Sequence, residues 1–357
     1  MNQWILYKGT CYSLDEFIRC FEAENSMAGA SADVLRSWLE NQDIFTLSTS
    51  GSTGQPSLIT FSRKQLEYSA LQTINFFGLT AGDTLFLCLP VKKVAGFMML
   101  IRALTGKMNI VMSEPSALPE IPAREEIHID LAAFIPFQLQ NLIQSKPEMI
   151  EKLKGCKGVI AGGNAVNSFQ EKLFENMPFT VYETYGMTET LTHIALRKLN
   201  HPGKQAFFTL LPEVEISLNE ENCLMIRSTV TNNKWLETND IAEILSKKSF
   251  IIKGRKDFVI NSGGIKINPE FIEQKIFGVL HVLTGGKTFY VTGKRDEKYG
   301  EKICLVMESD EPEGELKEKI INTCNDLLEK HEKIKEIICQ NEISRTETGK
   351  IIRKKIL

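Results

Sequence analysis

The chain has 357 residues, 43% of them hydrophobic and 24% charged, which is enough for one large or two modest globular domains. Its formal net charge of −3 leaves no basic excess to neutralise a nucleic-acid backbone, so we expect no nucleic-acid partner. The longest apolar run, residues 94–101, is too short to span a membrane, and the N-terminus lacks the pattern of a signal peptide. We therefore expect a cytoplasmic protein.

Residues 44–255 alternate short apolar runs with longer stretches of helical spacing, as in α/β layers. From residue 256 onward the pattern is that of a compact α+β unit. The predicted fold class is α/β, with a large domain over residues 1–254 and a small α+β domain over residues 255–357. The helices expected in these two parts cover residues 64–77, 94–105, 138–153, 269–277 and 313–330.

A segment rich in glycine and hydroxyl side chains, TLSTSGSTGQPS at residues 46–57, separates two apolar stretches. Such residues contribute little apolar burial, so the segment is either a linker or becomes ordered around a bound group. We expect a strand before it and a helix after it, an arrangement that directs backbone N–H groups at phosphate. The Walker A spacing is absent, so a different phosphate chemistry is expected.

Five segments, in chain order, resemble the motifs of the adenylate-forming (ANL) superfamily of acyl-CoA synthetases, luciferases and nonribosomal adenylation domains. They are residues 50–57, 182–190, 235–244, 254–273 and 344–354. The first resembles the phosphate loop at Ser50, Gly51, Ser52, Thr53, Gly54 and Pro56. Ser57 replaces the usual lysine of that loop, Asn239 a usual glycine, and Ser344 a usual proline. The region before residue 45 is shorter than is usual in this superfamily.

The resemblance implies that the protein uses ATP to convert a carboxylic acid into an acyl-adenylate, and that CoA then displaces AMP. Two unit charges about 4 Å apart repel by about 4 kcal/mol at an effective dielectric constant of 20, so cations are needed where the anions meet. The resemblance implies Lys350 as the decisive catalytic cation, with Thr188 and Glu189 as further catalytic residues. It also implies that Glu189 and Thr53 hold Mg²⁺. Taken alone, Lys350 also fits a solvated basic tail, and Glu189 an ordinary acid at a helix start.

The resemblance also implies a nucleotide site. In it Tyr185 stacks on adenine beside Gly186, and Asp240 accepts hydrogen bonds from both ribose hydroxyls. Arg255 is either a second ribose or phosphate contact or part of a surface salt bridge. The residues implied to line the base are Gly162, Gly163 and Asn164.

The two half-reactions need the same space, because a thiol must enter where Lys350 first lies. The resemblance implies that the small domain rotates about a hinge at Asp257. Gly263 and Gly264 would then approach the pantetheine arm in a CoA tunnel.

Residues 88–111 and 134–143 are similar to parts of the o-succinylbenzoate–CoA ligases of menaquinone biosynthesis. Gly96 and Arg102 fit the acid-binding positions, and Lys93 stands where histidine is usual. An arginine inside an apolar helix indicates a buried anionic partner, such as the second carboxylate of a dicarboxylic acid. Alternatively, the tip of Arg102 reaches the surface.

Three other functions stay open. The chain could activate another aryl or fatty acid, or load an acyl group onto a carrier protein. It could also be an inactive nucleotide-binding sensor, as the loss of lysine at position 57 suggests. In each case we expect small-molecule partners, no membrane span and a possible homodimer.

Overall fold

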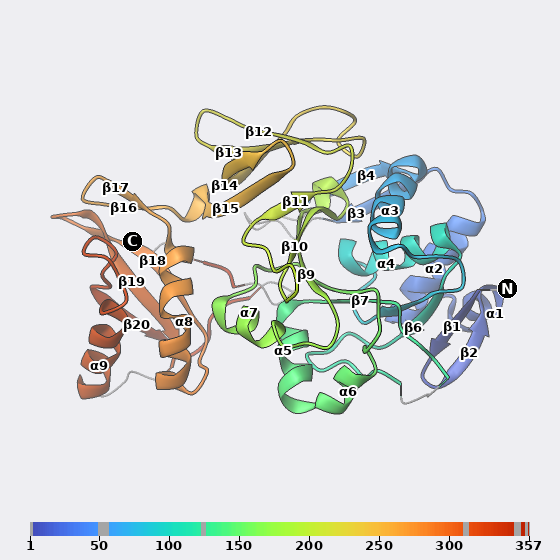
Figure 1. Cartoon of the computed structure of the whole chain (residues 1–357), viewed down its shortest axis with the longest axis horizontal. Helices are drawn as coiled ribbons and strands as arrows, with labels where there is room; N and C mark the ends of the chain where they lie inside the picture. The colour runs from blue at the N-terminus through green and yellow to red at the C-terminus, as the bar shows by residue number, and fades with distance from the viewer. Residues whose placement is uncertain are drawn as a thin grey trace.

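The computed structural model describes residues 3–48, 57–122, 126–309, 314–345, 351–353 and 356. The N-terminal strands lie at one end of the molecule and a small C-terminal unit lies at the other, with a broad sheet between them (Figure 1). Within the described ranges no helix is both long and apolar enough to cross a bilayer.

One large sheet runs through most of the chain. In the described part it has thirteen strands in the order β12-β13-β14-β15-β11-β10-β9-β8-β7-β5-β6-β1-β2. These strands are β1 (Trp4–Tyr7), β2 (Thr10–Ser13), β5 (Thr84–Leu87), β6 (Asn109–Met112), β7 (Leu131–Phe134), β8 (Gly158–Ala161), β9 (Val181–Gly186), β10 (His193–Lys198), β11 (Phe208–Leu210), β12 (Glu215–Leu218), β13 (Cys223–Arg227), β14 (Leu236–Ser246) and β15 (Ser249–Arg255). The half from β1 to β9 is parallel. The half from β9 to β12 is antiparallel.

The helices of the large unit begin and end where local sequence signals place them. They are α1 (Leu14–Phe21), α2 (Met27–Leu39), α3 (Arg63–Phe77), α4 (Val94–Gly106), α5 (Pro136–Ser145), α6 (Pro147–Glu151) and α7 (Ser168–Phe174). Helix α3 starts after Ser62, whose side chain accepts from the Gln65 N–H, and ends at Gly78 in the left-handed conformation. The single helix expected at 138–153 is divided at Pro147, because the residue before a proline is disfavoured in helical geometry.

The glycine-rich segment is carried by a β-hairpin. Strand β3 (Ile44–Ser48) pairs antiparallel with β4 (Leu58–Ser62), so a second strand, which we did not predict, lies between the segment and the expected helix. Leu58, Thr60 and Ser62 alternate with Ile59 and Phe61 along β4, a period of two that suits a strand. Helix α3 therefore begins after β4, and its N-terminus does not directly follow the segment.

Over its described residues, the small C-terminal unit has its own five-stranded sheet. Its elements are β16 (Ile260–Ser262), β17 (Ile265–Ile267), α8 (Pro269–Thr284), β18 (Phe289–Asp296), β19 (Gly300–Glu308), α9 (Gly314–Asn325) and β20 (Glu336–Gln340). This mixture of elements confirms the predicted α/β fold class with a small α+β part. The main apolar core of the large unit ends at Phe250, and that of the small unit begins at Ile260. A domain boundary between 254 and 255 stays a prediction.

Gly96 in α4 is buried, and its lack of a side chain has a direct structural reason. A Cβ atom at this position would overlap the backbone carbonyl oxygens of Leu89 and Pro90. The helix therefore lies directly against the segment that follows β5. Gly96 thus lets α4, which carries Arg102, approach the sheet edge.

Replacing Gly96 with alanine should lower the free energy of unfolding by about 1–3 kcal/mol, because backbone atoms must move apart. Gly278 is a matched control, since it lies inside α8 with no atom within 4 Å of its ideal Cβ. Gly278→Ala should stabilise the protein by roughly 0.5–1 kcal/mol. Urea unfolding followed by circular dichroism measures both changes, and a Gly96→Ala variant as stable as the Gly278→Ala variant would contradict this packing.

Candidate active site

Several predicted site residues meet at one edge of the parallel sheet. Strands β5, β7, β8 and β9 are neighbours and run in the same direction. Lys93 and Gly96 follow β5, the segment 162–164 follows β8, and Tyr185 and Gly186 end β9. The carboxyl ends of parallel strands form the usual ligand-binding edge of open α/β sheets. The fold thus brings the predicted acid-binding and adenine-binding segments to the same edge.

The segment predicted to line adenine is held against the strands on both sides. The Gly162 N–H donates to the Phe134 carbonyl oxygen at 3.0 Å, and a Cβ on Gly162 would overlap the Thr184 side chain. Gly163 adopts a φ of 87°, which favours glycine. A few residues later, the Val166 N–H donates to Glu183 Oε1 at 2.8 Å. Asn164 lies between these anchors.

Glu183 is a supporting residue that we did not identify from the sequence. Its buried carboxylate also accepts from Arg197 Nε at 2.8 Å, and Arg197 in turn pairs with Glu171. Burial raises the pKa of Glu183, while Arg197 opposes that change. An acid inside an otherwise apolar strand of the YETYG segment was the available signal. Glu183 fixes the segment predicted to line adenine to β9.

Asp240 lies at the centre of the nucleotide residues. Its carboxylate is 8% exposed and accepts a hydrogen bond from the Tyr185 hydroxyl at 2.7 Å. Arg255 is directly opposite Asp240 across β14 and β15, and Arg255 Nη1 donates to Oδ1 at 3.4 Å. Burial and the Asp240 charge raise the pKa of Tyr185 well above its usual value, so the phenol stays a donor. Three residues predicted for the nucleotide site are therefore in direct contact.

The predicted hinge residue is linked to this cluster. Asp257, in a short helical turn over Lys256–Phe258, accepts from Arg255 Nη2 at 2.6 Å and from Asn239 Nδ2 at 3.3 Å. Burial alone would lower the pKa of Arg255, but the carboxylates of Asp257 and Asp240 raise it above its usual value. Arg255 thus forms salt bridges, which was the alternative to a ribose or phosphate contact. One of its partners is Asp240, the carboxylate predicted to bind ribose.

The loop carrying Thr188 and Glu189 is rigid. Thr190 Oγ1 contacts backbone atoms of Met187 and Thr192 at 2.8–3.0 Å. Leu191 has a φ of 63° with a fully buried side chain. Glu189 is half-buried, and its carboxylate has no hydrogen-bond or ion-pair partner among the described residues.

This arrangement fits Mg²⁺ held largely by phosphate. Within the described ranges no three His, Cys, Asp or Glu residues are grouped to hold a metal. Mg²⁺ at nucleotide sites commonly uses only one or two protein carboxylates together with phosphate oxygens and water. The Glu189 carboxylate is therefore a suitable single ligand.

Arg102 is almost fully enclosed, with 2% exposure. Its Nη2 donates to Thr192 Oγ1 at 2.9 Å, its Nη1 contacts the Met99 sulfur at 3.5 Å, and its Nε has no partner. In the described part of the chain no carboxylate pairs with it. Burial lowers the pKa of Arg102 to about 9, so it still carries its charge at neutral pH. The alternative in which the arginine tip reaches the surface is wrong.

Lys93 is half-buried at the start of the same helix.

Gly263 and Gly264 form the two-residue turn between β16 and β17. Their φ values are 61° and 81°, the pattern of a type I′ hairpin turn. The turn by itself explains both glycines, and the CoA tunnel stays a prediction.

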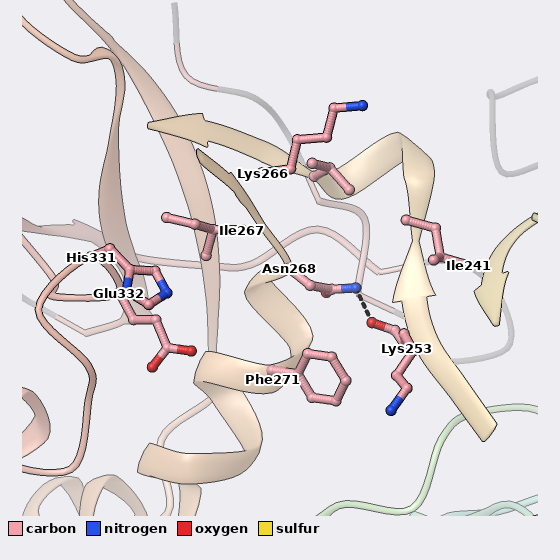
Figure 2. Close-up of a pocket in the computed structure, with 9 residues that line it drawn as sticks. Ile241, Lys253, Lys266, Ile267, Asn268, Phe271, His331 and Glu332 are labelled. Carbon is pink, nitrogen blue, oxygen red and sulfur yellow. Dashed lines mark hydrogen bonds between the residues drawn. The ribbon is translucent and has the colours of Figure 1, made fainter. Parts of the chain in front are cut away.

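A groove of about 290 Å³ separates β14–β15 from the small unit (Figure 2). Its apolar lining includes Ile241, Ile267 and Phe271. The Asn268 side-chain amide bridges the two units by donating to the Lys253 carbonyl oxygen. The chain passes between the units beside this groove.

Six predicted residues lie outside the described residues. These are Ser50, Gly51, Ser52, Thr53, Gly54 and Lys350. Their roles stay predictions.

Comparisons with known proteins identify the family of the chain. The profile of the AMP-binding enzyme family matches residues 10–224. A long-chain-fatty-acid–CoA ligase, FadD13, from Mycobacterium tuberculosis H37Rv is 26% identical over 341 residues, which cover 88% of this chain and 67% of that protein. A 2-succinylbenzoate–CoA ligase from Oceanobacillus iheyensis is 25% identical over 362 residues, covering 93% and 73%.

Two solved structures are similar over most of the chain. An acyl-CoA synthetase (AMP-forming)/AMP-acid ligase II-like protein from Dyadobacter fermentans is 34% identical with a TM-score of 0.62, covering 94% of this chain and 95% of that chain. O-succinylbenzoate CoA synthetase from Bacillus subtilis, in complex with ATP and magnesium, shares the fold with a TM-score of 0.70 at 19% identity, covering 86% and 68%. The chain belongs to the AMP-binding enzyme family, which includes the AMP-forming acyl-CoA ligases.

Proposed function

We propose that the protein is an ATP-dependent acid–CoA ligase whose acid is o-succinylbenzoate, a dicarboxylate. A carboxylate oxygen of the acid attacks the α-phosphorus of ATP and pyrophosphate leaves. The CoA sulfur, having lost its proton, then attacks the acyl carbon and AMP leaves. Such a reaction would place the protein in menaquinone biosynthesis in the cytoplasm. A homodimer stays a prediction.

The buried charge of Arg102 is the observation that favours a dicarboxylic acid as the substrate. A buried guanidinium without an anionic partner is costly, and a carboxylate is the group that matches its planar donors. Arg102 has a free Nε donor and no carboxylate partner among the described residues. A substrate with a second carboxylate supplies that partner. Relatives named as 2-succinylbenzoate–CoA ligases support the same choice.

The nucleotide residues support the use of ATP. We assign the buried carboxylate of Asp240 to the ribose hydroxyls, and Tyr185 and the segment 162–164 to adenine. Glu189 is a single carboxylate suited to Mg²⁺. Thr188 precedes it in the same turn, and we keep Thr188 as the residue that bonds the α-phosphate. We keep Lys350 as the cation that offsets the repulsion between the two reacting anions.

A fatty acid is the second candidate substrate. FadD13 is similar to the chain at 26% identity, and Arg102 follows a run of buried apolar residues in α4. These residues are Phe97, Met98, Met99, Leu100 and Ile101. A fatty acid would bring no partner for the Arg102 charge, which is why we favour the dicarboxylate.

We also propose that the small unit rotates about Asp257 between the two half-reactions. Away from the hinge, α7 contacts α8. Ser168 Oγ donates to the Gln274 carbonyl oxygen at 3.1 Å, and the Phe169 ring lies 4.8 Å from the His281 ring and 6.0 Å from the Phe277 ring. Interfaces between units of one chain usually allow relative motion unless they are large and hydrophobic.

The acid is tested by ATP–pyrophosphate exchange with o-succinylbenzoate, with benzoylpropionate, which lacks the ring carboxylate, and with a long-chain fatty acid. We expect o-succinylbenzoate to support exchange best. Arg102→Met should raise its KM by about tenfold to a hundredfold, because a hydrogen-bonded charge is lost.

Arg36 on α2 provides the matched control, because it forms an exposed ion pair with Glu22. Arg36→Met should therefore leave every KM nearly unchanged. If the fatty acid is the best substrate and Arg102→Met does not affect the KM values, the dicarboxylate assignment is wrong.

The hinge is tested by comparing Asp257→Pro with Asp257→Ala. Proline restricts φ at the hinge, whereas alanine removes the same carboxylate and leaves the backbone free. We expect Asp257→Pro to retain pyrophosphate exchange but to lose thioester formation by about a hundredfold, because the second arrangement of the site is not reached. Asp257→Ala should lose far less. A similar loss of both half-reactions in the proline variant would place the hinge elsewhere.

A further inference from the structure

Behind Arg102 lies a chain of polar side chains that the nucleotide site does not use. Arg102 Nη2 is 2.9 Å from Thr192 Oγ1, which is 3.3 Å from His193 Nδ1. His193 Nε2 is 3.1 Å from Thr73 Oγ1. Arg102, His193 and Thr73 are each at most 6% exposed. Three separate elements, α3, α4 and the start of β10, thus contribute to one buried row of hydrogen bonds.

The first member of this row fixes one proton position: arginine can only donate, so Thr192 Oγ1 accepts from Arg102. We assign the Thr192 hydroxyl hydrogen to His193 Nδ1, which leaves the ring hydrogen on Nε2, where it donates to Thr73. Burial, together with the Arg102 charge, lowers the pKa of His193 well below its usual value, in agreement with a neutral ring.

A further hydrogen bond links the row to the loop that carries Thr188 and Glu189. The Thr192 carbonyl oxygen accepts from Thr190 Oγ1 at 2.8 Å, so the backbone that carries Thr192 is fixed by the turn that holds Glu189. Thr192 therefore has a set position for both its backbone and its hydroxyl. The guanidinium beside it is held by this hydrogen bond and by the contact of Nη1 with the Met99 sulfur, while the buried Nε has no partner.

We propose that Thr192 and His193 are positioning residues for Arg102, and that they set the preference of the enzyme for an acid with a second carboxylate. This inference rests on the proposed function. His193 accepts the Thr192 hydrogen and so keeps the lone pairs of that hydroxyl facing Arg102. Being neutral, it adds no second positive charge that would repel the guanidinium.

The test measures the ratio of kcat/KM for o-succinylbenzoate to that for benzoylpropionate in pyrophosphate exchange. Thr192→Val removes the hydroxyl at similar volume, and we expect the ratio to fall about tenfold, because a charge-assisted hydrogen bond is lost. The fall should come from KM for o-succinylbenzoate rather than from kcat. Thr192→Ser keeps the hydroxyl and should keep the ratio.

At position 193 the conservative change is His193→Asn, whose amide oxygen lies near the place of Nδ1 and can accept from Thr192. We expect this variant to retain most of the ratio and His193→Phe to lose it. Thermal unfolding of each variant identifies any that fails to fold, and the serine and asparagine variants keep the test open in that case.

The outcomes separate the two proposals. If Arg102→Met does not change the ratio, the proposed dicarboxylate function is wrong. If Arg102→Met lowers the ratio but folded Thr192→Val and His193→Phe variants do not, the positioning role alone is overturned. A lowered ratio in all three, with rescue by Thr192→Ser and His193→Asn, supports it.

Discussion

The hydrogen-bonded carboxylate of Asp240 is the group on which the predicted nucleotide site and the predicted hinge both depend. It is buried, and it is compensated by the Tyr185 hydroxyl from the parallel half of the sheet and by Arg255 from the neighbouring strand. Removing one partner of such a buried group leaves a charge uncompensated, which is why the arrangement is fixed. Because Arg255 also pairs with Asp257, the nucleotide residues and the predicted hinge form one charged unit. Occupation of the ribose position and the orientation of the small unit are therefore expected to be coupled.

The buried charges of the large unit fall into two kinds. Glu183 and Arg197 compensate each other and hold the adenine segment, so their role is complete within the protein. Arg102 is buried more deeply than Arg197, yet the described residues offer it only a hydroxyl and a sulfur. A folded chain tolerates an incomplete set of partners where a ligand supplies the missing one. The contrast between these two arginines is the physical reason for assigning Arg102 to substrate.

The sequence predicted the parts of this protein that depend on local patterns. The helices at 63–77 and 94–106 and the small α+β unit agree with the expectations within a few residues. Long-range pairing was not predictable in the same way. The strand β4, which precedes the expected helix at 64–77, was not predicted, because its place in a hairpin depends on the pairing with β3.

Burial and partners were likewise beyond the sequence. Leu316 and Leu327 share the helical spacing of the buried residues Ile320 and Cys324, yet both are more than 40% exposed, and Leu327 lies beyond the end of α9 at Asn325. The supporting roles of Glu183 and Thr192 depend on neighbours distant in sequence.

The most direct measurement of the central interaction is the Kd of AMP for the wild-type protein and for Asp240→Asn, compared with the Kd of dideoxyadenosine monophosphate, which lacks both ribose hydroxyls. Asp240→Asn should weaken AMP binding by about tenfold or more and change the binding of the dideoxy nucleotide far less. Equal weakening for both nucleotides, or none for either, would contradict a role for this carboxylate in holding the ribose.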